Sequence, residues 1–165
     1  IRVFRGHEDD VLQRFVMVAD YLDAPFLIRA TGDNPAVDID APARVADMAM
    51  VSGADHVVEA GLPMGSAVEA VRVAALYEAA ARTRDAYDRE HVTPYLYRTP
   101  GRFRAVSPLA PRAVRRPDVR LTVDTRVDLE FVNAVWRRLG EIGSLPPLPA
   151  IIAAADLVVR GELSS

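Results

Sequence analysis

The chain has 165 residues, 50% hydrophobic and 26% charged, which fits one soluble globular domain with a substantial core. Its formal net charge of −3 gives no reason to expect nucleic acid or an anionic membrane as a partner. Cysteine is absent and all 20 basic residues are arginine, which excludes disulfides, thiolate catalysis, cysteine-ligated zinc and any role for lysine.

No apolar stretch approaches the roughly 20 residues of a membrane-spanning helix, and no signal peptide is visible, so a cytoplasmic protein is expected. The chain opens on Ile1-Arg2-Val3-Phe4-Arg5, which predicts a short strand before Gly6. A domain that begins within a strand is expected to lack a preceding segment, which has been removed, lies outside this sequence, or sits on another chain. Acidic residues at 8–10 then introduce a helix that ends near Leu22, and helix N-terminal electrostatics is their simplest interpretation.

A buried strand is predicted over residues 24–30, and it ends in Thr31-Gly32-Asp33-Asn34-Pro35. Gly32 permits a tight turn or close approach to a ligand, and Pro35 prevents the strand from continuing. Asp33 can serve as an Asx turn or a cap. Its position favours function, because ligands of open α/β sheets bind outside the carboxyl ends of the strands.

The middle of the chain alternates helices and strands. A helix is predicted from residue 40 to Gly53, a strand over residues 54–59, and a Gly- and Pro-rich loop over residues 61–66 that lacks any phosphate-binding signature. An alternating apolar segment follows over residues 67–71. Glu69 interrupts it with a carboxylate, which must face either solvent or a partner.

A predicted helix over residues 72–84 leads to a polar cluster at residues 85–95. Arg89 offers bidentate hydrogen bonding, and His91 offers a group that titrates near neutrality. The alternative is a solvated helix start in which neighbouring acids offset Arg89. Neither a nucleophile elbow nor further zinc-ligand spacing accompanies His91.

A second acidic strand end follows in the last third of the chain. Strands are predicted over residues 103–106 and 119–123, and the second delivers Asp124 at its end. Thr125 and Asp128 resemble a capping box for a helix that continues to about Leu139. Because these two residues can cap the helix, the Asp124 carboxylate is left for another task. A last helix is predicted over residues 150–159.

Four segments together resemble the cytidylyltransferases of the spore-coat polysaccharide type, relatives of the enzymes that make CMP-activated acidic sugars. They are Gly6-His7-Glu8-Asp9-Asp10-Val11-Leu12, Thr31-Gly32-Asp33-Asn34-Pro35, Asp88-Arg89-Glu90-His91-Val92-Thr93-Pro94-Tyr95 and Leu121-Thr122-Val123-Asp124-Thr125. The resemblance implies an α/β fold with a mixed, mostly parallel Rossmann-like sheet of the nucleotide-diphospho-sugar transferase type, missing its first strand and loop. It further implies one domain over residues 1–165, the C-terminal portion of an enzyme that transfers CMP from CTP to an acceptor and releases pyrophosphate.

The resemblance also implies roles for individual residues. Asp33 and Asp124 match the family's metal-binding aspartates, and Mg²⁺ prefers such hard oxygen ligands. Arg89 and His91 fall in the acceptor-side motif, so they are candidates for catalysis and for holding an anionic acceptor, either a sugar acid or a phosphonate. The remaining candidate substrate-binding residues are Thr31, Gly32 and Glu69.

Two departures from the family pattern qualify these expectations. Ser66 and Ala67 stand where relatives often place another acidic residue, which implies a different acceptor or a weaker metal site. The Gly- and Arg-containing loop that ends in Lys and binds CTP does not occur in this sequence, so the chain alone is not expected to bind CTP well. The alternative function is a non-catalytic binding or assembly module, as a homodimer or with a partner chain that supplies the segment.

Overall fold

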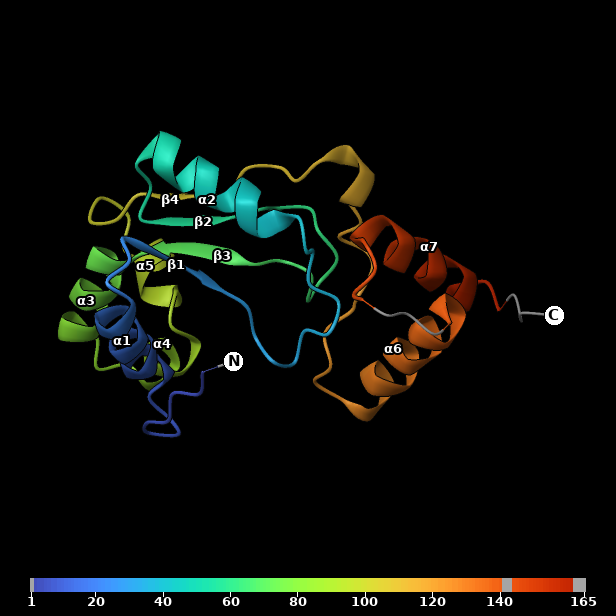
Figure 1. The fold of residues 1–165 in the computed structure, drawn as a ribbon, viewed down its shortest axis with the longest axis horizontal. Helices are drawn as coiled ribbons and strands as arrows, with labels where there is room; N and C mark the ends of the chain where they lie inside the picture. The colour runs from blue at the N-terminus through green and yellow to red at the C-terminus, as the bar shows by residue number, and fades with distance from the viewer. Residues whose placement is uncertain (1, 141–143, 162–165) are drawn as a thin grey trace. The chain divides into compact units, whose positions relative to one another are not determined.

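The computed structural model describes residues 2–140 and 144–161, and Figure 1 shows its ribbon. The chain divides into two compact units. Unit 1 comprises Ile1–Arg29, Val45–Val58 and Glu69–Ser107, and unit 2 comprises Ala30–Arg44, Glu59–Val68 and Pro108–Ser165. The expectation of a single domain over residues 1–165 stays a prediction.

Unit 1 contains an open sheet with the strand order β1-β3-β2-β4 in the described part of the chain. The strands are β1 (Phe26–Arg29), β2 (His56–Val58), β3 (Glu69–Arg72) and β4 (Ala105–Val106). β3 is antiparallel to β1 and β2, while β2 and β4 are parallel, so β1, β2 and β4 share one direction. The expected α/β fold with a mixed sheet is confirmed, and β3 is the strand that runs against the others.

Helices cover both faces of this sheet, as Figure 1 shows. α2 (Ala41–Ser52) lies over one face, and the other face carries α1 (Val11–Leu22), α3 (Val73–Arg82), α4 (Ala86–His91) and α5 (Pro94–Arg98). Leu27 and Val71 of the sheet share a buried cluster with Leu76 of α3. Because side chains alternate along a strand, Glu69 lies on the same helix-covered face as Val71. A carboxylate therefore sits beside the apolar core of unit 1.

Two predicted strands are wrong. Residues 2–5 pair with no strand among the described residues and instead run beside α1, where the Phe4 ring contacts the Tyr21 ring and the Arg2 guanidinium lies over the Tyr21 ring. Ile1 is outside the described residues. The segment at residues 119–123 makes only an isolated bridge between Met64 and Arg120. Its backbone pairs with two separate loops instead of one neighbouring strand, so no ladder extends.

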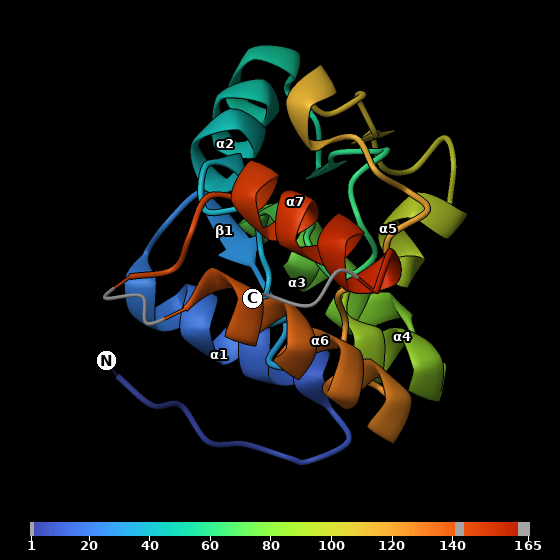
Figure 2. The ribbon, with the colours of Figure 1, turned by 90° about the vertical axis from the view of Figure 1, so that its right-hand side faces the viewer.

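Unit 2 contains mostly irregular segments packed on α6 (Arg126–Leu139), α7 (Leu148–Val159) and the 3₁₀ turn η1 (Arg112–Val114). Figure 2 shows α6 and α7 side by side. Leu121, Val135 and Ile151 belong to the buried apolar cluster of this unit. Among the helices of residues 2–140 and 144–161, none combines the length and hydrophobicity that a membrane span requires.

The predicted capping box at the start of α6 is confirmed. The Asp128 N–H donates to Thr125 Oγ1 at 3.2 Å, and the Thr125 N–H donates to the Asp128 carboxylate at 2.9 Å. Arg120 also donates two hydrogen bonds to the Asp128 carboxylate, from Nε to Oδ1 at 2.7 Å and from Nη2 to Oδ2 at 3.1 Å. The hydrogen bond from Arg120 is the largest effect on this carboxyl group and, against the opposing effect of burial, holds the pKa of Asp128 below its usual range.

We expect Asp128 to make the free energy of unfolding depend on pH in the acidic range. Since its folded-state pKa lies below the unfolded value of about 4, its contribution is complete above that pH and is lost as the pH falls toward the folded-state pKa. Urea denaturation at a series of pH values would measure this. As the pH falls from neutral to acidic, the free energy of unfolding should decrease less for Asp128→Asn than for the wild type. Asp47→Asn is the control, because Asp47 is exposed on α2 and has no ion-pair partner in the described chain.

Candidate functional site

Asp33 lies in an exposed turn of unit 2. Asn34 closes this turn, with Nδ2 donating to Thr31 Oγ1 at 2.6 Å and its N–H donating to the Thr31 carbonyl at 3.2 Å. Across residues 2–140 and 144–161, no group hydrogen-bonds or ion-pairs with the Asp33 carboxylate. The turn is thus held by its neighbours, and the Asp33 carboxylate is available to a ligand.

Asp124 lies beside this turn. The Val123 N–H donates to the Asp33 carbonyl oxygen at 2.9 Å, so the residue that follows Val123 is held next to Asp33. The Asp124 side chain is 48% exposed, and it accepts a hydrogen bond from Arg120 Nη2 at 2.5 Å. The backbone segments that carry the two predicted metal ligands are therefore adjacent within unit 2; the Asp33 carboxylate has no protein partner in the described residues, and that of Asp124 is paired with an arginine.

The Gly-rich loop packs against the segment that carries Asp124. Met64 donates its N–H to the Val119 carbonyl at 2.9 Å and accepts from the Leu121 N–H at 2.7 Å. Gly65 has a φ of +90°, and a Cβ atom there would lie 2.5 Å from the backbone nitrogen of Thr122. Glycine is required at this position both by the backbone conformation and by the close approach.

Asp33 and Asp124 offer two carboxylates, which is a donor set that Mg²⁺ can use only with further ligands from outside the protein. The described residues contain no group of three or more His, Asp or Glu side chains that could hold a metal ion alone. Mg²⁺ commonly uses one or two carboxylates, with waters and substrate phosphates as its other ligands. Ser66 adds no carboxylate here; its hydroxyl is fully buried and has no hydrogen-bond partner in the described chain.

Arg89 of unit 1 is fully engaged by protein groups. Its Nε and Nη2 donate to Asp10 Oδ2 at 2.8 and 2.5 Å, and its Nη1 donates to the Ala80 and Thr83 carbonyls at 3.0 and 3.4 Å. Asp10 is also the N-cap of α1 and accepts from the Gln13 N–H. Arg89 thereby ties α4 to α1 and to the end of α3. To bind an anionic acceptor, Arg89 would have to break its ion pair with Asp10.

His91, at the end of α4, is open to a ligand. Its side chain is exposed, and its ring lies 4.2 Å from the Tyr87 ring, centroid to centroid, at an interplanar angle of 58°. No hydrogen bond to the His91 imidazole occurs within the described residues. Of the two predicted acceptor-side residues, His91 is the one whose polar atoms are unused by the protein.

Glu69 faces partners and not solvent. Its carboxylate accepts from Arg29 Nη1 at 2.8 Å and from Thr93 Oγ1 at 3.2 Å to each oxygen, and His56 Nε2 lies 3.3 Å from Oε1. Burial alone would raise the pKa of Glu69, but the contact with His56 and the charge of Arg29 outweigh it and hold that pKa below its usual value. Glu69 is therefore an ionised, enclosed group.

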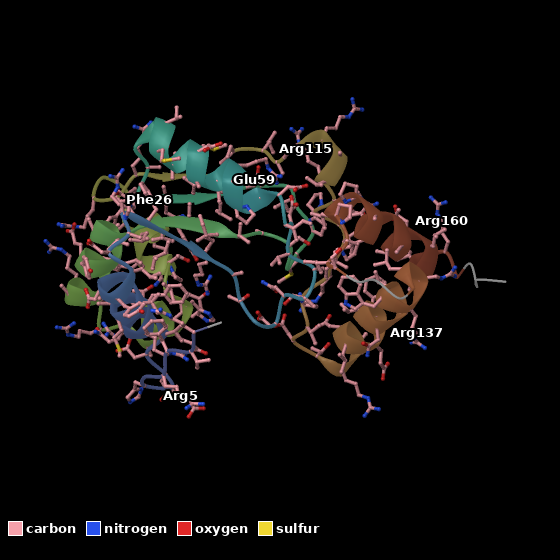
Figure 3. The ribbon with its side chains drawn as sticks, viewed as in Figure 1. Arg5, Phe26, Glu59, Arg115, Arg137 and Arg160 are labelled. Carbon is pink, nitrogen blue, oxygen red and sulfur yellow. The ribbon has the colours of Figure 1, made fainter. Side chains whose placement is uncertain are left out.

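Sequence reasoning missed two sets of polar residues. Arg29, His56 and Thr93 surround Glu69, although each is separated from it by many residues in the chain. In unit 2, Arg44 Nη2 donates to the buried carboxylates of Asp38 and Glu59, at 2.6 Å each; Figure 3 labels Glu59 beside α2. Asp38 and Glu59 carry no local motif, so only the folded backbone identifies them as partners of one arginine.

A family model described as cytidylyltransferase matches residues 1–143. The chain belongs to the cytidylyltransferase family. This cytidylyltransferase chain is 36% identical over 142 residues to the spore coat polysaccharide biosynthesis protein SpsF of Bacillus subtilis, covering 85% of the chain and 59% of SpsF. It is 33% identical over 131 residues to an uncharacterized protein of Methanocaldococcus jannaschii, covering 79% of the chain and 54% of that protein.

A solved cytidylyltransferase from Leptospira borgpetersenii has the same fold. The two structures superpose with a TM-score of 0.79 at 21% sequence identity, over 96% of this chain and 66% of that one. The predicted resemblance and fold class are thus confirmed. The chain spans a little over half the length of the two curated relatives that it matches.

We predict that Gly65→Ala displaces the loop from the Asp124 segment. The new Cβ would meet the Thr122 backbone, and alanine would have to adopt a positive φ, so we expect a destabilisation of about 1–3 kcal/mol. Gly101→Ala is the matched control, because Gly101 has a φ of +87° but no atom lies within 4 Å of the place that an added methyl group would take. Chemical denaturation would measure both; equal effects would contradict a role for close approach.

Proposed function

We propose that this chain supplies the metal-binding and acceptor-binding parts of a CTP-dependent cytidylyltransferase. The enzyme would transfer CMP to an anionic acceptor with release of pyrophosphate. The single observation that carries the proposal is the Val123 N–H to Asp33 carbonyl hydrogen bond of 2.9 Å, which makes the backbone segments of two exposed aspartates, Asp33 and Asp124, adjacent. Membership of the cytidylyltransferase family gives that pair its chemical context.

Magnesium would be held by the Asp33 and Asp124 carboxylates. When bound, it would neutralise charge on the CTP phosphates and help orient the reacting oxygens. The protein's own contribution would be to hold both carboxylates in place. The hydrogen bond between Thr31 and Asn34 shapes the Asp33 loop, and Thr125 and Asp128 cap α6, so the Asp124 side chain is not needed as the cap. Thr31 and Gly32 would bind substrate beside the metal, where the backbone of Gly32 leaves room for a close approach.

The acceptor would be an anion held by His91. The unused imidazole supports this assignment, while the use of every Arg89 nitrogen by Asp10 and two carbonyls supports a role for Arg89 in fixing α4. The name of the Bacillus subtilis relative favours a sugar acid over a phosphonate. In the reaction, an acceptor oxygen would bond to the α-phosphorus while the bond to the α–β bridging oxygen breaks. Pyrophosphate would leave with that electron pair, and any acceptor hydroxyl proton would pass to solvent. A cytoplasmic location stays a prediction.

A second candidate function is a binding module that pairs with another chain or a second copy. In the described part of the chain, β1 has a strand neighbour on one side only, and its Ile28 side chain is 40% exposed. Such an edge can accept a further strand. Analytical ultracentrifugation that shows only a monomer, with or without an added cytidylyltransferase N-terminal segment, would contradict this candidate.

A direct assay would test the transferase function. The chain, alone and complemented with the N-terminal segment of a cytidylyltransferase relative, would be mixed with CTP, Mg²⁺ and a panel of sugar acids and phosphonates. We expect pyrophosphate release that depends on the acceptor and on the metal. Release with UTP or ATP as readily as with CTP, or none with any acceptor in the complemented protein, would contradict the proposal.

We predict that Asp33→Asn and Asp124→Asn each reduce metal-dependent turnover by at least roughly 100-fold, since even outer-shell changes cost about 10- to 100-fold. Thermal unfolding should change little for Asp33→Asn, because the Asp33 carboxylate has no protein partner in the described residues. Asp118→Asn makes the same chemical change at an aspartate paired with Arg116 and should keep activity. Unfolding with normal specific activity in the folded fraction would instead indicate structural aspartates.

A further inference from the structure

The backbone between α4 and α5 is strained at Val92. This residue has φ +74° and ψ −56°, and the Thr93 N–H donates to the His91 carbonyl at 2.9 Å. A hydrogen bond between residues i and i+2 around such angles defines a γ-turn of the rare, strained kind. Valine is poorly suited to it, because positive φ is unfavourable for β-branched residues. The turn follows directly on His91, the exposed end residue of α4.

Packing and one polar contact hold the turn in place. The Val92 side chain is fully buried in the apolar cluster of unit 1. Thr93, itself 3% exposed, donates its hydroxyl to the Glu69 carboxylate, at 3.2 Å from both oxygens. Strained backbone persists only where surrounding structure over-determines it. Thr93 is thus anchored to β3 of the sheet at the residue where the γ-turn ends.

Glu69 is in turn fixed by the two neighbouring strands. Arg29 is its direct cross-strand partner in β1, with Nη1 at 2.8 Å from Oε2. His56 of β2, 2% exposed, places Nε2 at 3.3 Å from Oε1, a close polar contact that does not meet hydrogen-bond geometry. The His56 ring also lies 5.9 Å from the Tyr97 ring of α5, centroid to centroid. Glu69 therefore receives contacts from β1, β2 and the start of α5.

A second contact, between Asp88 and Arg98, connects α4 to α5. Asp88 of α4 is 3% exposed, accepts from Thr83 Oγ1 at 2.8 Å, and forms an ion pair with Arg98 of α5. α4 and α5 are thus joined by Asp88 and Arg98, while Thr93 joins the turn between them to Glu69. Thr93 follows His91 by two residues, so its connection to Glu69 lies next to His91.

We propose that Glu69 is a positioning residue that locks the γ-turn at Val92 and so fixes His91, and that His56 supports Glu69 in this role. Because His91 is the acceptor contact of the proposed function, the consequence for activity rests on that function. The lock itself is a property of the folded chain. The Glu69 carboxylate is in contact with Arg29, Thr93 and His56. It therefore acts on the acceptor indirectly, through Thr93 and His91.

Amide hydrogen exchange followed by NMR would test the lock without any substrate. Thr93→Val removes the hydroxyl and keeps the shape, and Glu69→Gln weakens the acceptor. We expect each to reduce protection of the residue 93 amide by about fivefold or more, as for the loss of one net hydrogen bond, and to shift the backbone signals of residues 91–93 and the His91 ring. Thr99→Val is the matched control, since Thr99 Oγ1 donates to the Tyr95 carbonyl at the other end of α5.

Substitutions at His56 test the supporting role. Glutamine can place a donor nitrogen near the position of Nε2, whereas phenylalanine keeps the ring without a donor. We expect His56→Gln to retain protection at residue 93 and His56→Phe to lose it. Unchanged protection and unchanged residue 91–93 signals in Thr93→Val, Glu69→Gln and His56→Phe would overturn the proposal, as would an equal loss in Thr99→Val.

Kinetics on the acceptor that gives turnover would then test the consequence. Thr93→Val should raise the acceptor KM by about tenfold with a much smaller change in kcat, because His91 is displaced while the metal ligands are untouched. A fall in kcat at constant KM would contradict positioning through His91. If the complemented protein has no transferase activity at all, the proposed function fails, whereas the exchange measurements still decide whether the lock exists.

Discussion

A carboxylate can be buried beside an apolar core only where cationic and hydroxyl groups converge on it, and the sheet of unit 1 meets this condition at Glu69. Arg29 stands directly opposite Glu69 in the β1–β3 pairing, and His56 reaches it diagonally from β2. A shift of one residue in either pairing would turn these side chains to opposite faces and leave a buried charge unpaired, at a cost of several kcal/mol. The ion cluster therefore fixes the register of three strands as well as the turn before α5.

In unit 2 a single guanidinium, that of Arg120, connects the segment that carries Asp124 to its surroundings. Arg120 contacts Asp124, Asp128 and the Met64 sulfur, so it joins the capping box, the candidate metal ligand and the Gly-rich loop. A metal ion at Asp124 would compete with Arg120 for that carboxylate, but the two contacts to Asp128 would still hold the arginine in place. Asp124 is thereby kept oriented without a metal, while Asp33 is kept oriented by its own turn. The two aspartates of the proposed metal site therefore differ in their surroundings, one held by its own turn and one paired with an arginine.

The sequence was informative wherever the determining contacts are local. The capping box at Thr125 and Asp128 depends on residues three apart, and the helix positions depend on spacing along one face, so both could be predicted. The predicted strand at residues 119–123 failed because its partners are two loops whose paths have no local signature. Arg89 is paired with Asp10, 79 residues away, and Glu69 with Arg29, 40 residues away. Such pairs depend on the register and helix packing of the whole unit, which hydrophobic periodicity does not specify.

Val92 is the position where local preference and the folded structure disagree most. A β-branched residue at positive φ carries a cost of about 1–3 kcal/mol, which glycine would avoid. Glycine would also remove the buried side chain that packs in the apolar cluster. It would allow the backbone more conformations at this position, in the folded and in the unfolded state. Valine, anchored through Thr93 to Glu69, instead gives a turn with one accessible conformation. If His91 holds the acceptor as proposed, a rigid turn would reduce the ordering entropy lost on binding. The strain at Val92 is thus consistent with a preorganised contact at His91, within one unit of the protein and independent of how the two units are placed.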